Sequence, residues 1–119
     1  MPKSTTETMD RELKRGTIEL VILTLLSERE RYGYEIVSTL EERSGDRLEV
    51  KDGTLYPVLY RLEDAGFVEP RWETRERGVP RKYYRLTEEG AEEHARLVER
   101  WREFSAAVES ILSWGRSGE

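Results

Sequence analysis

Cysteine is absent from this 119-residue sequence, and histidine occurs once, as His94. Without thiols the chain has no disulfide framework, no thiolate metal site and no cysteine nucleophile. One imidazole cannot build a zinc site that needs several, although carboxylate ligation of a hard cation stays open. We therefore expect neither a metal nor a cofactor, and we assign His94 a structural role.

Long apolar runs are also missing. No run approaches the roughly 20 residues that span a bilayer, and the N-terminus lacks the apolar core of a signal peptide. The sequence shows no Ser–His–Asp arrangement, no glycine-rich phosphate loop and no pair of carboxylates at metal-binding spacing. It thus predicts a soluble, cytoplasmic protein that is not an enzyme and does not bind a membrane.

Positive charge is scarce except in one segment. The chain has 20 basic and 25 acidic residues, which gives a net charge of −5. Residues 69–87 nevertheless hold six basic residues against three acidic ones. A cationic segment in an otherwise acidic chain is typical of an element that contacts nucleic acid. The length suggests one domain, or one domain plus an assembly helix.

Apolar residues at helical spacing predict three helices in the first half of the chain. The first begins near the N-cap Asp10, and the second has about 11 residues and ends at Ser44-Gly45. The third begins at Asp52 or Thr54 and ends at Gly66. Its apolar side chains lie within a narrow arc of the helix, at Leu55, Val58, Leu59 and Leu62.

The pattern then changes to that of strands. Residues 67–72 and 81–86 are rich in aromatic or β-branched side chains, and about eight turn residues separate them. Thr87 then caps a helix that runs to about Ser113, about 40 Å at 1.5 Å per residue. We predict a mainly α fold with a small β-hairpin: a winged helix-turn-helix plus a long C-terminal dimerisation helix. The predicted parts are a flexible arm (1–9), a DNA-binding domain (10–86), the dimerisation helix (87–113) and a tail (114–119).

Candidate DNA-binding residues lie on the third helix and the hairpin. A recognition helix presents hydrogen-bonding side chains to base edges near its N-terminal end, and basic side chains contact phosphates. The third helix offers Thr54, Tyr56, Tyr60 and Arg61, with Lys51 just ahead. The hairpin offers Arg75 and Arg77 at its tip and Arg81 and Lys82 on the return strand. The alternatives are a solvated helix face with incidental tyrosines and a charged turn that keeps the hairpin edge soluble.

The last helix has an apolar stripe that needs a cover. We predict a two-fold dimer interface that includes Val98, Trp101, Ser105, Val108 and Leu112. The alternative is that this helix folds back onto the first one. Trp101 with Phe104 either lines a hydrophobic slot for flat ligands or simply anchors the interface. We expect Trp72 to pack between the hairpin and the helices.

Four ordered motifs resemble the signature of PadR-family regulators, in the compact subfamily with a single long C-terminal helix. The resemblance covers about residues 13–112. The motifs are Gly16-Thr17-Ile18-Glu19-Leu20, Tyr32-Gly33-Tyr34-Glu35-Ile36, Gly53-Thr54-Leu55-Tyr56-Pro57 with Arg61-Leu62-Glu63, and Arg81-Lys82-Tyr83-Tyr84-Arg85-Leu86-Thr87 with Gly90. Arg31 departs from the family, in which many members have a small or apolar residue at this position; it bears on the approach of the second helix to phosphate.

The resemblance implies a homodimeric winged-helix repressor that binds a palindromic operator. It implies that a tryptophan at position 101 can line a central pore that takes flat aromatic effectors. By position, the operator-reading residues are Tyr34, Lys51, Thr54, Tyr56, Pro57, Tyr60 and Arg61, and the wing residues are Arg77, Arg81 and Lys82. The competing hypothesis is a winged helix that binds another protein and has no specific DNA site.

Overall fold

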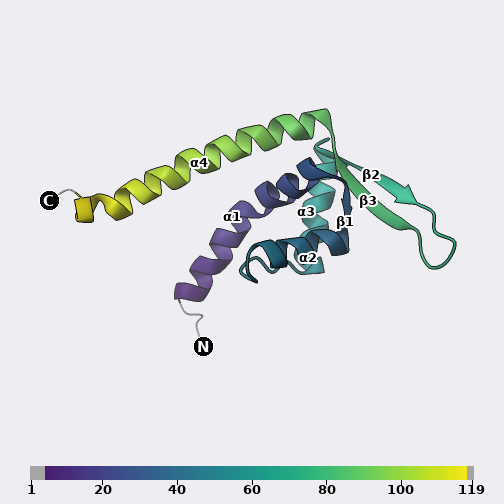
Figure 1. Ribbon diagram of the computed structural model, residues 1–119, viewed down its shortest axis with the longest axis horizontal. Helices are drawn as coiled ribbons and strands as arrows, with labels where there is room; N and C mark the ends of the chain where they lie inside the picture. The colour runs from purple at the N-terminus through teal and green to yellow at the C-terminus, as the bar shows by residue number, and fades with distance from the viewer. Residues whose placement is uncertain (1–4, 118–119) are drawn as a thin grey trace.

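The structure is a computed structural model that describes residues 5–117, and most of these residues are helical. The elements in chain order are α1 (Thr5–Glu28), β1 (Arg31–Tyr32), α2 (Gly33–Arg43), α3 (Asp52–Asp64), β2 (Val68–Glu73), β3 (Arg81–Leu86) and α4 (Glu88–Ser117) (Figure 1). This confirms the predicted winged helix-turn-helix with a long C-terminal helix. Within the described residues, no helix has the length and apolar character needed to cross a membrane.

The wing is a three-stranded antiparallel sheet rather than the predicted two-stranded hairpin. Its strand order is β1-β3-β2, and β1 pairs Arg31 with Tyr84 and Tyr32 with Tyr83. A strand of two residues has no period that a sequence pattern could reveal. The tip, residues 74–80, projects away from the helices (Figure 1).

The core lies where α1, α2 and α3 meet the sheet. Ile22, Ile36, Leu55 and Leu59 are fully buried there, and Tyr84 of β3 closes the core from the sheet side. Removing such a side chain costs about 2–5 kcal/mol because the cavity does not collapse. The four side chains of the apolar arc predicted on the third helix are all buried, so the core fixes which face of α3 is exposed.

Two helix boundaries differ from the sequence-based expectation. The first helix begins at Thr5 rather than at Asp10, so part of the predicted arm is helical, while residues 1–4 lie outside the described residues. The third helix begins at Asp52, the earlier of the two predicted starts, which places Pro57 inside it. Proline has no N–H to give to the carbonyl of Gly53. This costs little because Gly53 is exposed and water reaches it.

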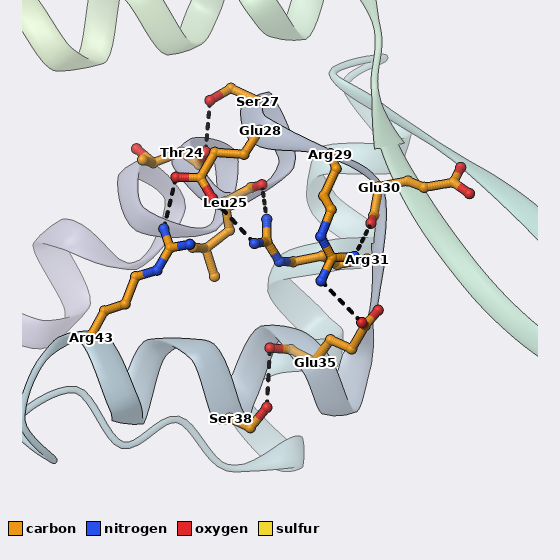
Figure 2. Close-up of polar contacts among 10 residues, drawn as sticks. All are labelled: Thr24, Leu25, Ser27, Glu28, Arg29, Glu30, Arg31, Glu35, Ser38 and Arg43. Atoms are coloured by element: carbon orange, nitrogen blue, oxygen red, sulfur yellow. Dashed lines mark hydrogen bonds and ion pairs between the residues drawn. The ribbon is translucent and has the colours of Figure 1, made fainter.

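Arg31 joins the end of α1 to β1 and α2 (Figure 2). The residue is 4% exposed, and its Nη1 donates to the carbonyl oxygen of Leu25 in the last turn of α1. Nη2 lies 3.2 Å from Oε1 of Glu28, and Oε2 of Glu28 accepts a hydrogen bond of 2.7 Å from Arg43 on α2. Arg31 therefore points into the domain and does not face a phosphate.

The long helix leaves the domain from a tight junction. The Thr87 hydroxyl accepts from the N–H of Gly90, as expected of a cap, and donates to the carbonyl of Gly66. A Cβ at position 90 would collide with the carbonyl of Phe67, so only glycine allows this approach. His94 Nε2 lies 2.9 Å from Oγ1 of Thr24 on α1. The first part of α4 therefore runs along α1, and the rest extends away from the domain (Figure 1).

We predict that Glu28→Gln destabilises the protein near neutral pH and that this difference disappears in acid. The hydrogen bond from Arg43 holds the pKa of Glu28 below its ordinary 4.5, against partial desolvation, and Arg31 adds to the lowering. A lowered pKa stabilises the folded state above the unfolded-state value, and this contribution is lost as the pH falls through the folded-state value. Urea unfolding between about pH 7 and about pH 3 measures the difference in unfolding free energy between the variant and the unaltered protein. Glu92→Gln on α4 is the control, and an equal pH dependence in both variants would contradict the assignment.

Candidate nucleic-acid interface

The exposed side of α3 carries the residues that the sequence assigned to base reading. Thr54, Pro57, Tyr60 and Arg61 are exposed, and Lys51 caps the helix by accepting the N–H groups of the first turn at its carbonyl. Because the apolar residues at spacings of three and four turn inward, these exposed and mostly polar residues form the opposite face. The helix thus presents a ridge to solvent, made of Thr54, Pro57, Tyr60 and Arg61, which we call the polar ridge.

Tyr56 is half-buried and connects α3 to α2. Its hydroxyl lies against the backbone of Gly33 at the start of α2, where a Cβ would collide with it. Tyr34 on α2 is 71% exposed, and its ring stacks on that of Tyr32 with 6.4 Å between centroids. The contact between Gly33 and Tyr56 therefore holds the N-terminal end of α2 close to α3, with Tyr34 in solvent beside them.

Lys82 fills the space between α3 and the wing. Its ammonium lies 5.0 Å from the ring centre of Tyr84, 5.6 Å from that of Tyr60 and 5.7 Å from that of Trp72. Oε1 of Glu63 lies 3.6 Å away. Cations over aromatic faces are attracted by the ring quadrupole, with about 0.5–2 kcal/mol per contact. Lys82 therefore ties the wing to α3, a task that the sequence did not reveal.

These contacts also shift the pKa values of Lys82 and Tyr84. Burial lowers the pKa of the Lys82 ammonium, but the side chains of Tyr84 and Glu63 outweigh it and raise the pKa overall. Burial raises the pKa of the Tyr84 hydroxyl, and Lys82 opposes part of this rise. At neutral pH, Lys82 therefore carries its charge among the rings.

Trp72 does not pack between the hairpin and the helices, as the sequence analysis expected. Its side chain is 62% exposed. It pairs with Lys82 in the register of β2 and β3, and it lines the edge of a hollow between the wing and α3. Its ring lies near the Lys82 ammonium and is not part of the hydrophobic core.

The six basic residues of the wing fall into three groups. Arg71 binds both carboxylate oxygens of Glu30, and Arg85 donates to Glu69 at 2.7 Å. Two cations lie against rings: the guanidinium of Arg81 is 4.1 Å above the ring centre of Tyr32, and Lys82 lies among three rings. Among the described side chains, only the tip residues lack a carboxylate or ring partner on the wing: Arg75 and Arg77. The tip is therefore the free cationic part of the wing.

Arg61 has a partner that the sequence did not indicate. Its Nε and Nη2 donate to Oε1 of Glu19 on α1, at 3.0 and 2.7 Å. The two residues are 42 positions apart, so no local pattern could connect them. The pair is exposed, and such pairs contribute about 0–1 kcal/mol. Arg61 can therefore leave Glu19 at little cost when a stronger acceptor arrives.

The distal part of α4 exposes large apolar side chains. Trp101 is 44% exposed, and Phe104, Ile111 and Leu112 are more so. Val98 and Ser105 are half-buried. Among the side chains that the structure describes, no group of three or more His, Cys, Asp or Glu residues is placed to hold a metal ion. The exposed apolar face lies on the distal part of α4 and the polar ridge lies on α3, so the two are separate surfaces.

Comparison with known proteins gives consistent matches. Residues 22–96 match the transcriptional regulator PadR-like family. The chain is 35% identical to an uncharacterized protein of Lysinibacillus sphaericus, over 85% of this chain and 93% of that protein. It is 34% identical to the negative transcriptional regulator PadR of Bacillus subtilis strain 168, over 64% of this chain and 42% of the relative. The match therefore spans less than half of that regulator's length.

Solved structures share most of this architecture. A PadR family transcriptional regulator from Eggerthella lenta superposes with a TM-score of 0.80 at 33% identity, over 90% of this chain and 91% of that one. A PadR-like regulator from Bacillus cereus superposes with a TM-score of 0.74 at 30% identity, over 85% and 96% of the two chains. With its winged helix, its polar ridge on α3 and these matches, the chain belongs to the PadR-like family of transcriptional regulators.

Proposed function

We propose that the protein is a homodimeric repressor that binds a palindromic operator. The observation that carries this proposal is the polar ridge of α3 beside a wing whose tip arginines have no carboxylate partner among the described side chains. A helix with its side chains is about 10–12 Å wide, which fits a major groove of about 12 Å. The name of the B. subtilis relative, a negative regulator, favours repression over activation.

Each side of the interface has its own task in this proposal. Thr54, Tyr60 and Arg61 face base edges, Tyr34 and Lys51 meet the flanking backbone, and Tyr56 and Pro57 lie in the same ridge. The tip arginines, Arg75 and Arg77, contact phosphates or a narrow minor groove. Two residues that the sequence assigned to phosphate have structural contacts instead: Lys82 holds the wing against α3, and Arg81 lies on the ring of Tyr32 in β1.

The exposed face of α4 supports dimerisation. Side chains as large as Trp101, Phe104 and Leu112 are rarely left in water on one contiguous helix face. Pairing two copies of α4 through Val98, Trp101, Ser105, Val108 and Leu112 covers this face. A two-fold dimer then places half-sites about 10–10.5 base pairs apart, one turn of DNA.

A flat aromatic effector fits between the paired helices, against Trp101 and Phe104 of both subunits. Such a ligand weakens operator binding only as far as it prefers a dimer whose recognition helices no longer match the half-sites. Stacking on Trp101 quenches its fluorescence, which gives a direct titration. Retention of the same affinity by Trp101→Ala would remove this part of the proposal.

The deciding experiment is selection of duplexes from a random library, followed by binding at two salt concentrations. Phosphate contacts release counterions, so the affinity should fall steeply as salt rises. Enrichment of a palindrome with salt-sensitive binding supports the repressor. Binding that is flat in salt, or no enrichment, favours the competing hypothesis of a winged helix that contacts an acidic or neutral protein.

We predict that Arg77→Ala weakens binding to the operator and to unrelated duplexes by similar factors, because a phosphate contact carries no sequence information. Arg61→Ala should instead lose more of the specific binding, by about 1–3 kcal/mol for a base contact. Competition titrations with the operator and an unrelated duplex measure the ratio of specific to non-specific affinity for each variant. Arg85→Ala, which removes a cation already paired with Glu69, is the wing control. Equal loss of specificity in the Arg61 and Arg77 variants would refute this division.

We also predict that Trp101→Ala raises the dimer dissociation constant, because a central buried aromatic carries a large share of interface energy, about 2 kcal/mol or more. Sedimentation over a concentration series measures the change. Trp72→Ala, which removes an exposed tryptophan from the wing, should leave the dimer intact. An unchanged mass distribution for Trp101→Ala would place the interface elsewhere.

A further inference from the structure

The inward-facing stripe of α1 changes its chemistry along the helix. Ile18, Ile22 and Leu25 are buried in the core at spacings of three and four. The same stripe continues toward the N-terminus through positions 15, 14 and 11, which lie three, four and seven residues before Ile18. These positions hold Arg15, Lys14 and Arg11. The stripe is therefore apolar over the core and cationic where α1 extends beyond it.

The cationic part of this stripe forms one wall of a groove. The groove has a volume of about 540 Å³, and its opposite wall is α3, from Gly53 in its first turn to Arg61 in its last. Gly53, Thr54 and Arg61 line that wall, and Val50 and Val58 contribute apolar surface. The groove thus borders the polar ridge of α3, to which Thr54 and Arg61 also belong.

Two of the cations in the groove have no carboxylate partner among the described side chains, Arg11 and Lys14. The other two are paired: Arg15 lies 3.7 Å from Glu12, and Arg61 is hydrogen-bonded to Glu19. Glu49 adds one negative charge to the lining. The lining therefore holds four cations against one carboxylate, and its described side chains leave an excess of positive charge.

The groove and the wing lie on opposite flanks of α3. Tyr56, Tyr60 and Glu63 face the wing through Lys82 and its neighbouring rings. Gly53, Pro57 and Arg61 face α1. A helix inserted in a major groove has one phosphate strand on each side, because the groove is about as wide as the helix. A duplex seated on the ridge therefore brings one strand to the wing and the other to the α1 groove.

We propose that Arg11 and Lys14 form a second phosphate-binding surface for duplex DNA, on the flank of α3 opposite the wing. This inference rests on the proposed function and adds to it. Arg15 joins the surface when a DNA phosphate replaces Glu12 as its partner. Cations on both flanks then hold each recognition helix. They fix its position across the major groove of the DNA as well as how deeply it enters that groove.

The test uses the full chain and its selected operator. Arg11→Gln/Lys14→Gln should lower the affinity by roughly tenfold at low salt, and it should reduce the slope of log K against log salt by about 0.9 for each phosphate that is no longer neutralised. Ethylation interference should disappear at phosphates along one edge of the contacted major groove and persist at those on the wing edge. Arg77→Ala should give the reverse pattern.

Control variants separate this surface from a general charge effect. Arg96→Gln/Arg100→Gln removes the same charge from the exposed surface of α4, away from the groove, and should change neither slope nor pattern. Lys14→Arg should retain binding. Glu49→Gln, which removes the carboxylate from the groove, should strengthen binding and make it more sensitive to salt. Thermal unfolding verifies that each variant folds.

An unchanged slope and interference pattern in Arg11→Gln/Lys14→Gln, with operator binding intact, would overturn this inference and leave the proposed function standing. So would an equal effect from the α4 control. Failure of the unaltered chain to bind any duplex with salt sensitivity would overturn both.

Discussion

Packing of α3 against the core orients every surface around this helix. Leu55, Leu59 and Leu62 lie between α1, α2 and the sheet. Because these side chains cannot leave the core without opening a cavity, the helix cannot rotate about its axis. The polar ridge, the wing on one flank and the α1 groove on the other all follow from that fixed rotation.

Cations have three different tasks around this helix. Some bind carboxylates and join elements, as Arg71 does with Glu30; this hydrogen bond also holds the pKa of Glu30 below its ordinary value. Others lie against aromatic rings, as Lys82 does among Tyr60, Trp72 and Tyr84. A third group has no carboxylate partner among the described side chains, at the wing tip, at Lys51 and in the N-terminal part of α1. Only the last group offers a nucleic acid full charge without first breaking an internal contact, so a count of basic residues overstates the binding surface.

The proposed function assigns DNA reading to α3 and the wing, and assembly to the distal part of α4. The junction at Thr87 and Gly90 and the contact of His94 with Thr24 fix where α4 leaves the domain. Its distal apolar face therefore stands at a set direction from the ridge of α3. In the proposed dimer, a small change in how two α4 helices pack moves both recognition helices together, because each is joined rigidly to its own α4.

Local patterns in the chain were enough to predict the helices, the two long strands and the residues of the ridge, because helical and strand periodicity sort apolar from polar side chains. They also predicted the cap at Thr87 and the family. Four features instead required the folded chain: which cations are already engaged, the exposure of Trp72, the two-residue strand that completes the sheet, and the position of Arg11 and Lys14 across a groove from α3. These features depend on contacts between residues far apart in the chain, such as Arg61 and Glu19, 42 positions apart, which meet only once the core has packed.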